Sequence, residues 1–132
     1  MGNIEEFTLE GRNFVYIDLS DLTSTSKFRE ISVEIKSVIA KHPKNSLYTI
    51  TNIKNTKLDS ESKNIMVDYM EHNKPYVRHG VLIGMDGIKK VMALSMFKMV
   101  GRKNYSFAFS KEQAIERLLR HEIDDQEDKD GN

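Results

Sequence analysis

The sequence predicts a single α/β domain built around a mainly parallel sheet. Segments rich in β-branched and aromatic residues alternate with segments whose apolar residues recur at helical spacing. The connections between them are short, and the strand segments are apolar throughout, as expected of parallel strands covered on both faces. Four strand–helix pairs in succession, joined by right-handed crossovers, would place four mainly parallel strands side by side.

The first strand–helix pair occupies the N-terminal third of the chain. A buried strand is expected over Asn13–Leu19, with an additional weaker strand before it at Glu5–Leu9. The polar loop Ser20–Ser26 offers several helix N-cap residues, and apolar residues follow at helical spacing over Phe28–Ile39. Pro43 disfavours helical geometry at the residue before it, so this helix should end just ahead of the proline.

The remaining three pairs follow the same plan. A second strand at Leu47–Ile53 leads to a helix capped by Asp59 or Ser60. The third and fourth strands are expected at His79–Gly84 and Tyr105–Phe109. A helix is expected over Ile88–Val100, with Asp86 as its N-cap and Gly101 as its C′ residue. Ser110–Gln113 matches a capping box that begins the last helix.

The net charge of zero hides an asymmetry between the body of the chain and its end. Residues 122–132 carry six of the 20 acids and one of the 20 bases, which leaves 19 bases and 14 acids, a net charge of +5, in residues 1–121. We therefore expect one domain over residues 1–121 and an acidic, disordered tail over residues 122–132. A charge of +5 falls short of a strongly basic stripe, so nucleic acid is not expected as a partner.

Several functional classes find no support in the composition. The chain has no cysteine, its four histidines are far apart, and it contains neither a P-loop nor a Gly-x-Ser-x-Gly elbow. We expect no catalytic residue, no cofactor and no metal. The N-terminus lacks the features of a secretory signal, and no apolar run approaches the roughly 20 residues of a membrane span, so a cytoplasmic protein is expected.

The carboxyl ends of the predicted strands are where an enzyme of this fold class would place its site. The loops there are Ser20–Ser26, Lys54–Ser62 and Met85–Gly87, which offer hydroxyls and isolated acids but no base beside a nucleophile. Asp18 lies within an apolar strand, and a structural partner such as a loop hydroxyl explains it better than a catalytic role. An enzyme with a site in these loops remains an alternative.

The helix predicted at Ile88–Val100 is apolar on more sides than packing on one sheet requires. One explanation is a central helix buried by its neighbours. The other is a binding surface for a protein partner, a second copy of the chain, an anionic lipid or an apolar ligand. The residues predicted for this surface combine bases with methionines and a phenylalanine: Lys89, Lys90, Met92, Met96, Phe97, Lys98, Arg102 and Lys103.

Two serines at the junction between the second strand and its helix are candidate phosphorylation sites. Ser60 and Ser62 follow Asp59 at the start of the helix. Helix capping by itself accounts for Asp59 and Ser60, and capping is the explanation favoured by sequence physics. A phosphate at this position would also be stabilised by the free amides and the helix dipole, so a regulatory phosphosite is the alternative.

Several stretches together resemble the SpoIIAA-like proteins, which include the STAS and CRAL-TRIO-like small domains. The resemblance covers residues 13–119 and rests on IDLSDL, TNIKNTKLDSES and HNKPYVRHGVLIGMDGIKKV, followed by GRKNYSFAFSKEQAIERL. It implies a β/α superhelix of four turns around a small sheet. It also implies a non-enzymatic binding or regulatory module.

Within that family, the anti-sigma-factor antagonists bind a kinase-like protein and are switched by phosphorylation of a serine after an aspartate. The matching position is Asp59-Ser60, with Ser62 as a second possibility, although the Ser-Gly-Leu-Gly-like run of the antagonists is replaced by Glu61-Ser-Lys-Asn64. The resemblance therefore implies a protein partner, and its lipid-transfer branch implies a lipid or apolar ligand at the third helix.

Overall fold

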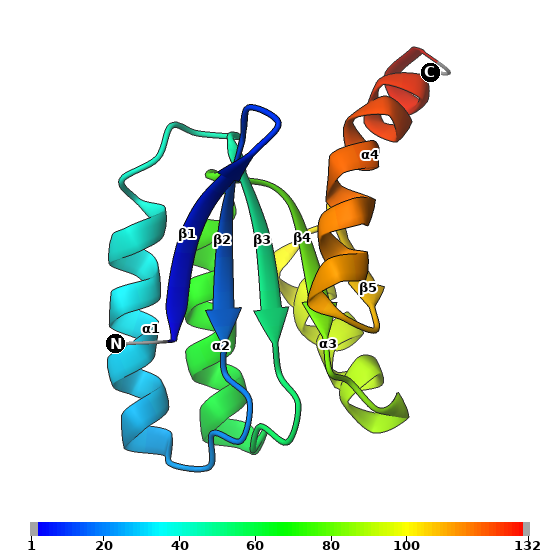
Figure 1. Ribbon diagram of the computed structural model, residues 1–132. Helices are drawn as coiled ribbons and strands as arrows, with labels where there is room; N and C mark the ends of the chain where they lie inside the picture. The colour runs from blue at the N-terminus through cyan, green and yellow to red at the C-terminus, as the bar shows by residue number, and fades with distance from the viewer. Residues whose placement is uncertain (1–2, 131–132) are drawn as a thin grey trace.

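Five strands form one sheet in the order in which they occur in the chain. The computed structural model describes residues 3–130, with side chains described for residues 3–120. Strand β1 pairs antiparallel with β2, and β2 to β5 run parallel to one another (Figure 1). The strands are β1 (Ile4–Leu9), β2 (Arg12–Asp18), β3 (Leu47–Asn52), β4 (Val77–Ile83) and β5 (Tyr105–Ala108).

Four helices follow the four parallel strands. They are α1 (Thr25–Ile39), α2 (Ser60–Asn73), α3 (Gly87–Val100) and α4 (Lys111–Asp130). The predicted alternation is confirmed, as is the additional N-terminal strand. That strand is joined to β2 by a tight hairpin in which Glu10 and Gly11 both have positive φ values, of 50° and 76°.

The two faces of the sheet are covered unequally. Residues of β2 to β4 alternate between faces, and one face packs against α1, α2 and α3 in a core that includes Ile17, Phe28, Met66 and Met96. The other face packs against α4 alone, through Ala114 and Leu118 (Figure 1). Sequential strand order with right-handed crossovers places the first three helices together on one side.

The predicted helix caps are present. The carboxylates of Asp59 and Asp86 accept backbone N–H groups from Ser62 and Lys89, both at 2.9 Å. Gly101 ends α3 with a left-handed φ of 73°, and the next N–H donates back to the Phe97 carbonyl at 2.9 Å.

Asp18, at the end of β2, has the structural role predicted for it. Its Oδ1 accepts hydrogen bonds from the hydroxyl of Ser20 at 2.6 Å and from the Ser20 backbone N–H at 3.0 Å. Both of these donors belong to the loop that follows the strand, so the carboxylate organises the turn into α1.

The helix α4 continues past the predicted domain boundary. Its backbone extends to Asp130, and it therefore includes residues 122–130 of the segment expected to be disordered. Apolar anchoring of α4 comes from Ala114 and Leu118, both fully buried, in its first half. The side chains beyond residue 120 lie outside the described part of the structure.

Candidate interaction surface

The solvent side of α3 is apolar. Four large side chains are exposed there, namely Ile88 at 77%, Val91 at 66%, Leu94 at 41% and Met99 at 67%. A helix on a protein surface ordinarily presents polar residues to water, and one that is apolar all round is usually covered. The prediction that this helix carries more apolar surface than its sheet requires is confirmed.

The inner side of α3 corrects part of the predicted surface. Met96 and Phe97 are 1% and 3% exposed, so they belong to the core and cannot contact a partner. Met92 is half-buried at the border. The ring of Phe97 stacks on that of Tyr105 in β5, with centroids 3.9 Å apart, and this contact turns that side of the helix toward the sheet.

Lysines border the exposed apolar side chains. Lys90, Lys98 and Lys103 are exposed, and within residues 3–120 no ion pair involves them. The ammonium of Lys90 lies 5.0 Å from the ring centroid of Phe107. Lys89 differs because it is half-buried and its Nζ approaches the Ile53 carbonyl at 3.4 Å. We call Ile88, Lys90, Val91, Leu94, Lys98, Met99 and Lys103 the α3 face.

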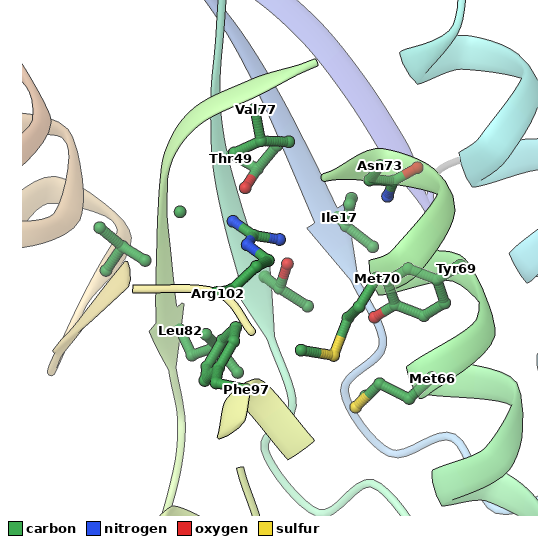
Figure 2. Close-up of a pocket in the computed structure, with 13 residues that line it drawn as sticks. Ile17, Thr49, Met66, Tyr69, Met70, Asn73, Val77, Leu82, Phe97 and Arg102 are labelled. Carbon is green, nitrogen blue, oxygen red and sulfur yellow. The ribbon is translucent and has the colours of Figure 1, made fainter. Parts of the chain in front are cut away.

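Arg102 is mostly buried, contrary to the prediction, although it also lines a groove beside Leu94, Lys98 and Lys103. Its side chain is 8% exposed and lies between the sheet and α2, beside Thr49, Asn73 and Tyr69 (Figure 2). The left-handed turn at Gly101 reverses the chain at the end of α3, and this directs the next side chain inward. Burial lowers the pKa of Arg102 to about 10.

Two grooves adjoin the α3 face along the edge strand β5. One, of about 420 Å³, is lined by Lys90, Phe107 and Phe109 together with Arg117 of α4. The other, of about 390 Å³, is lined by Leu94, Lys98 and Lys103, and Tyr105 borders both grooves. Phe109 is 94% exposed, and β5 pairs only with β4, so its outer edge is free among the described strands.

Sequence reasoning did not select Phe109, Arg117 or the exposed side of β5 as site residues. Phe109 completes an aromatic strand pattern, and such a residue is ordinarily read as core. The exposed stripe on α3 did leave a signal, because Ile88, Val91, Ser95 and Met99 recur at helical spacing and Ser95 is the only polar residue among these four. Choosing between the two apolar sides of the helix required the packing on β5.

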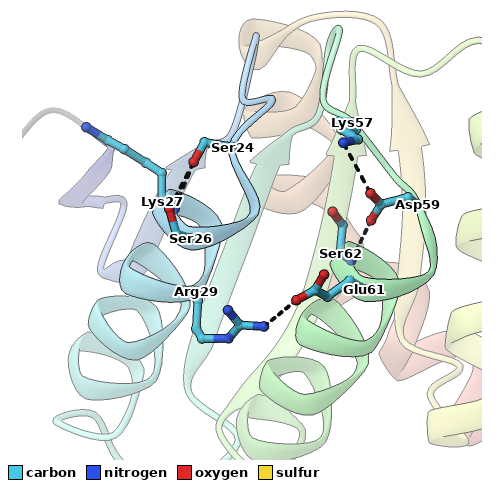
Figure 3. Close-up of polar contacts among 8 residues, drawn as sticks. All are labelled: Ser24, Ser26, Lys27, Arg29, Lys57, Asp59, Glu61 and Ser62. Carbon is cyan, nitrogen blue, oxygen red and sulfur yellow. Dashed lines mark hydrogen bonds and ion pairs between the residues drawn. The ribbon is translucent and has the colours of Figure 1, made fainter.

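The N-termini of α1 and α2 lie beside one another at the other candidate site (Figure 3). An ion pair of 2.9 Å joins Arg29 of α1 to Glu61 of α2. Lys57 lies 3.4 Å from the carboxylate of Asp59. The backbone N–H of Ser62, and then its hydroxyl, hold the pKa of Asp59 below its ordinary value.

The structure separates the two candidate phosphoserines. Ser62 is 2% exposed and packs inside the first turn of α2, so its hydroxyl is not accessible to a kinase in the folded chain. Ser60 is exposed at the first position of the helix. Ser60 alone therefore remains a candidate for phosphorylation of the native protein.

Two further observations concern the described residues. Within them, no group of three or more histidine, aspartate or glutamate side chains is arranged to hold a metal ion. None of the described helices has both the length and the apolar character needed to cross a bilayer.

Comparison with known proteins adds no assignment. Neither the scan against protein-family models nor the search of curated proteins finds a match for this chain. The SpoIIAA-like resemblance therefore rests on the sequence stretches quoted above.

Proposed function

We propose that this chain is a non-enzymatic binding module of STAS-like type that holds a protein partner on the α3 face and the adjoining edge of β5. The observation that carries the proposal is the exposure of Ile88, Val91, Leu94 and Met99 on one helix. Sequential strand order, with α1 to α3 on one side of the sheet, is what a SpoIIAA-like β/α superhelix requires, and it supports the proposed family.

The chemistry of the surface indicates the kind of partner. Apolar side chains at the centre with exposed lysines around them complement a segment that carries apolar residues flanked by aspartate or glutamate. The α3 face carries three lysines and no acid, so two copies packed face to face would repel one another, which disfavours a symmetric homodimer. The partner is therefore a different acidic surface.

The shape of the surface favours a protein over a membrane. A bilayer contacts a convex amphipathic face, whereas the grooves on both sides of Tyr105 are concave and of a size that receives side chains. The free edge of β5 adds backbone N–H and C=O groups that an extended segment can pair with. We assign anionic lipid to the runner-up position for this reason.

Selection from a library of random linear peptides displayed on phage tests the proposal. We expect the selected peptides to combine apolar residues with Asp or Glu and to lose about tenfold or more in affinity for Val91→Glu, because the new carboxylate is buried against apolar and acidic groups. Val33→Glu is the matched control, since Val33 is 61% exposed on α1, away from the α3 face.

Three results would contradict the proposal. Selected peptides that are basic, or that bind Val91→Glu as well as the wild type, would remove the α3 face as the contact surface. Failure to select any peptide, together with sedimentation on phosphatidylserine vesicles that Val91→Glu abolishes and Val33→Glu retains, would replace the protein partner with a membrane.

Regulation by phosphorylation is a second proposed function, favoured by the exposure of Ser60 beside Asp59. Added phosphate would lie at the free amides of α2, close to the ion pairs of Lys57 and Arg29. Phosphopeptide mapping of protein isolated from its native cell, across growth states, should find phosphate on Ser60 and none on Ser62. Protein unmodified in every state would leave helix capping as the full explanation.

A further inference from the structure

A polar cluster lies inside the core between the sheet and α2. The Arg102 guanidinium borders a cavity of about 30 Å³ that is also lined by Thr49, Thr51, Tyr69 and Asn73 (Figure 2). Thr49, Thr51 and Asn73 are each less than a tenth exposed, and so is Arg102. Polar groups in such a position are ordinarily hydrogen-bonded, and each unpaired group reduces stability.

Within residues 3–120, the positive charge of Arg102 has no carboxylate partner. Among residues 3–120, the Arg102 side chain donates one hydrogen bond, from Nε to the Asn104 side-chain oxygen at 3.4 Å. Its Cζ lies 5.6 Å from the ring centroid of Phe97. No hydrogen bond joins Nη1 or Nη2 to an acceptor in this part of the chain, and neither atom is fully buried, so both can reach solvent or a bound ion at the cavity. A cation with so little exposed area is stabilised by an anion close to it.

The other groups around the cavity are suited to an anion. Besides Arg102, they comprise the hydroxyls of Thr49 and Thr51, the Tyr69 phenol and the Asn73 amide, all of which can donate hydrogen bonds. Burial keeps Tyr69 protonated by raising its pKa well above the ordinary value, so the phenol supplies a donor and no negative charge. The lining therefore provides many donors and one cation, without an acid to balance them.

Gly80 keeps the cavity open. A Cβ at this position of β4 would lie 2.8 Å from the Thr49 hydroxyl and 3.0 Å from Nη2 of Arg102. Any larger residue would displace one or both of these groups. The glycine thus permits the guanidinium to lie directly over the strand.

We propose that this cavity binds a small monovalent anion, of the size of chloride or formate, through the guanidinium of Arg102 and the hydroxyls of Thr49 and Thr51. The volume of about 30 Å³ admits an ion of that size. Hydrated sulfate and hydrated phosphate are too large for it. The anion neutralises the buried cation and satisfies donors that the described protein groups leave unpaired. Arg102 also lines the groove beside Leu94, Lys98 and Lys103, whereas Thr49 and Thr51 line this cavity and not that groove.

Crystals grown in bromide test the proposal directly. We expect an anomalous bromide peak in the cavity, within hydrogen-bond distance of Nη1 or Nη2 of Arg102. Density for water alone in the cavity, with no bromide at high bromide concentration, would overturn the proposal.

Thermal unfolding supplies the second test, with chloride exchanged for gluconate at constant ionic strength. For a ligand that binds only the folded state, the free energy of unfolding increases with the logarithm of the ligand concentration. Tm should therefore rise by about 5 °C per tenfold increase in chloride once the chloride concentration exceeds the Kd of the site. Arg102→Met should abolish this dependence. Thr51→Val is nearly isosteric and provides the test if Arg102→Met fails to fold. It should weaken chloride binding severalfold.

Thr56→Val is the matched control. Thr56 is also buried, but its hydroxyl donates to the Leu19 carbonyl at 2.7 Å and does not line the cavity. This variant should lower Tm in both salts while the chloride dependence stays at its wild-type value. A dependence that persists unchanged in Thr51→Val and Arg102→Met, or that is absent from the wild type, would overturn the assignment of the site.

Discussion

The ring of Phe97 lies flat against the ring of Tyr105, with centroids 3.9 Å apart and planes 11° apart. This stack joins α3 to the edge strand, and Tyr105 in turn meets Phe107 edge-on at 5.9 Å. With one apolar side of α3 held against β5 in this way, the other side, which carries Val91 and Met99, faces solvent.

Stability measurements should distinguish the two sides of α3. Phe97→Ala removes a buried ring and its stack, and we expect the free energy of unfolding to fall by about 3 to 5 kcal/mol. Met99→Ala, on the exposed side of the same helix, should change it by no more than about 0.5 kcal/mol. Urea denaturation measures both. Equal effects of the two substitutions would show that the helix is rotated relative to this structure.

Alkaline pH should destabilise the protein partly through Tyr69. Burial raises the pKa of this phenol well above its ordinary value of 10, so the folded chain holds the proton more tightly than the unfolded chain does. The resulting stability is complete below about pH 10 and is lost as the pH rises further. Arg102 acts in the opposite direction, because its lowered pKa lets the folded chain release a proton first.

The variant Tyr69→Phe isolates the phenol, because it keeps the ring and removes the proton. Its Tm should fall less than that of the wild type between about pH 8 and about pH 11. Tm curves that remain parallel over this range would indicate that Tyr69 is not buried as described.

Removal of the acidic segment should leave the domain intact. A chain that ends at residue 121 keeps Ala114 and Leu118, the buried anchors of α4, and its free energy of unfolding should change by no more than about 0.5 kcal/mol. Its net charge changes from zero to +5, so it should bind acidic peptides more tightly at low salt. Isothermal titration at low and high salt measures this gain, which should disappear at high salt. A large loss of stability would extend the domain beyond residue 121.

The order of helices and strands could be predicted because it depends on local sequence patterns, such as helix caps and the spacing of apolar residues. The caps at Asp59 and Asp86, the left-handed Gly101 and the carboxylate–hydroxyl contact of Asp18 all depend on residues within a few positions of one another. Such contacts require no knowledge of the tertiary arrangement, and each is present.

The composition of the surface was predicted less well, for a physical reason. Two sides of α3 are apolar, so helical periodicity does not determine which of them packs on the sheet, and Met96 and Phe97, predicted for the surface, are buried. Arg102 follows a helix C-terminus, where bases ordinarily reach solvent. Its burial depends on space created by Gly80 and by the threonines of β3, which are distant in sequence.

An NMR titration of the protein with a selected acidic peptide tests the central claim, that the α3 face and the edge of β5 are the binding surface. The account predicts that the largest amide shift changes fall within residues 88–99 and 105–109, and that those of α1, including Val33, remain unchanged. Changes concentrated at the N-terminus of α2 or along β1 would contradict it.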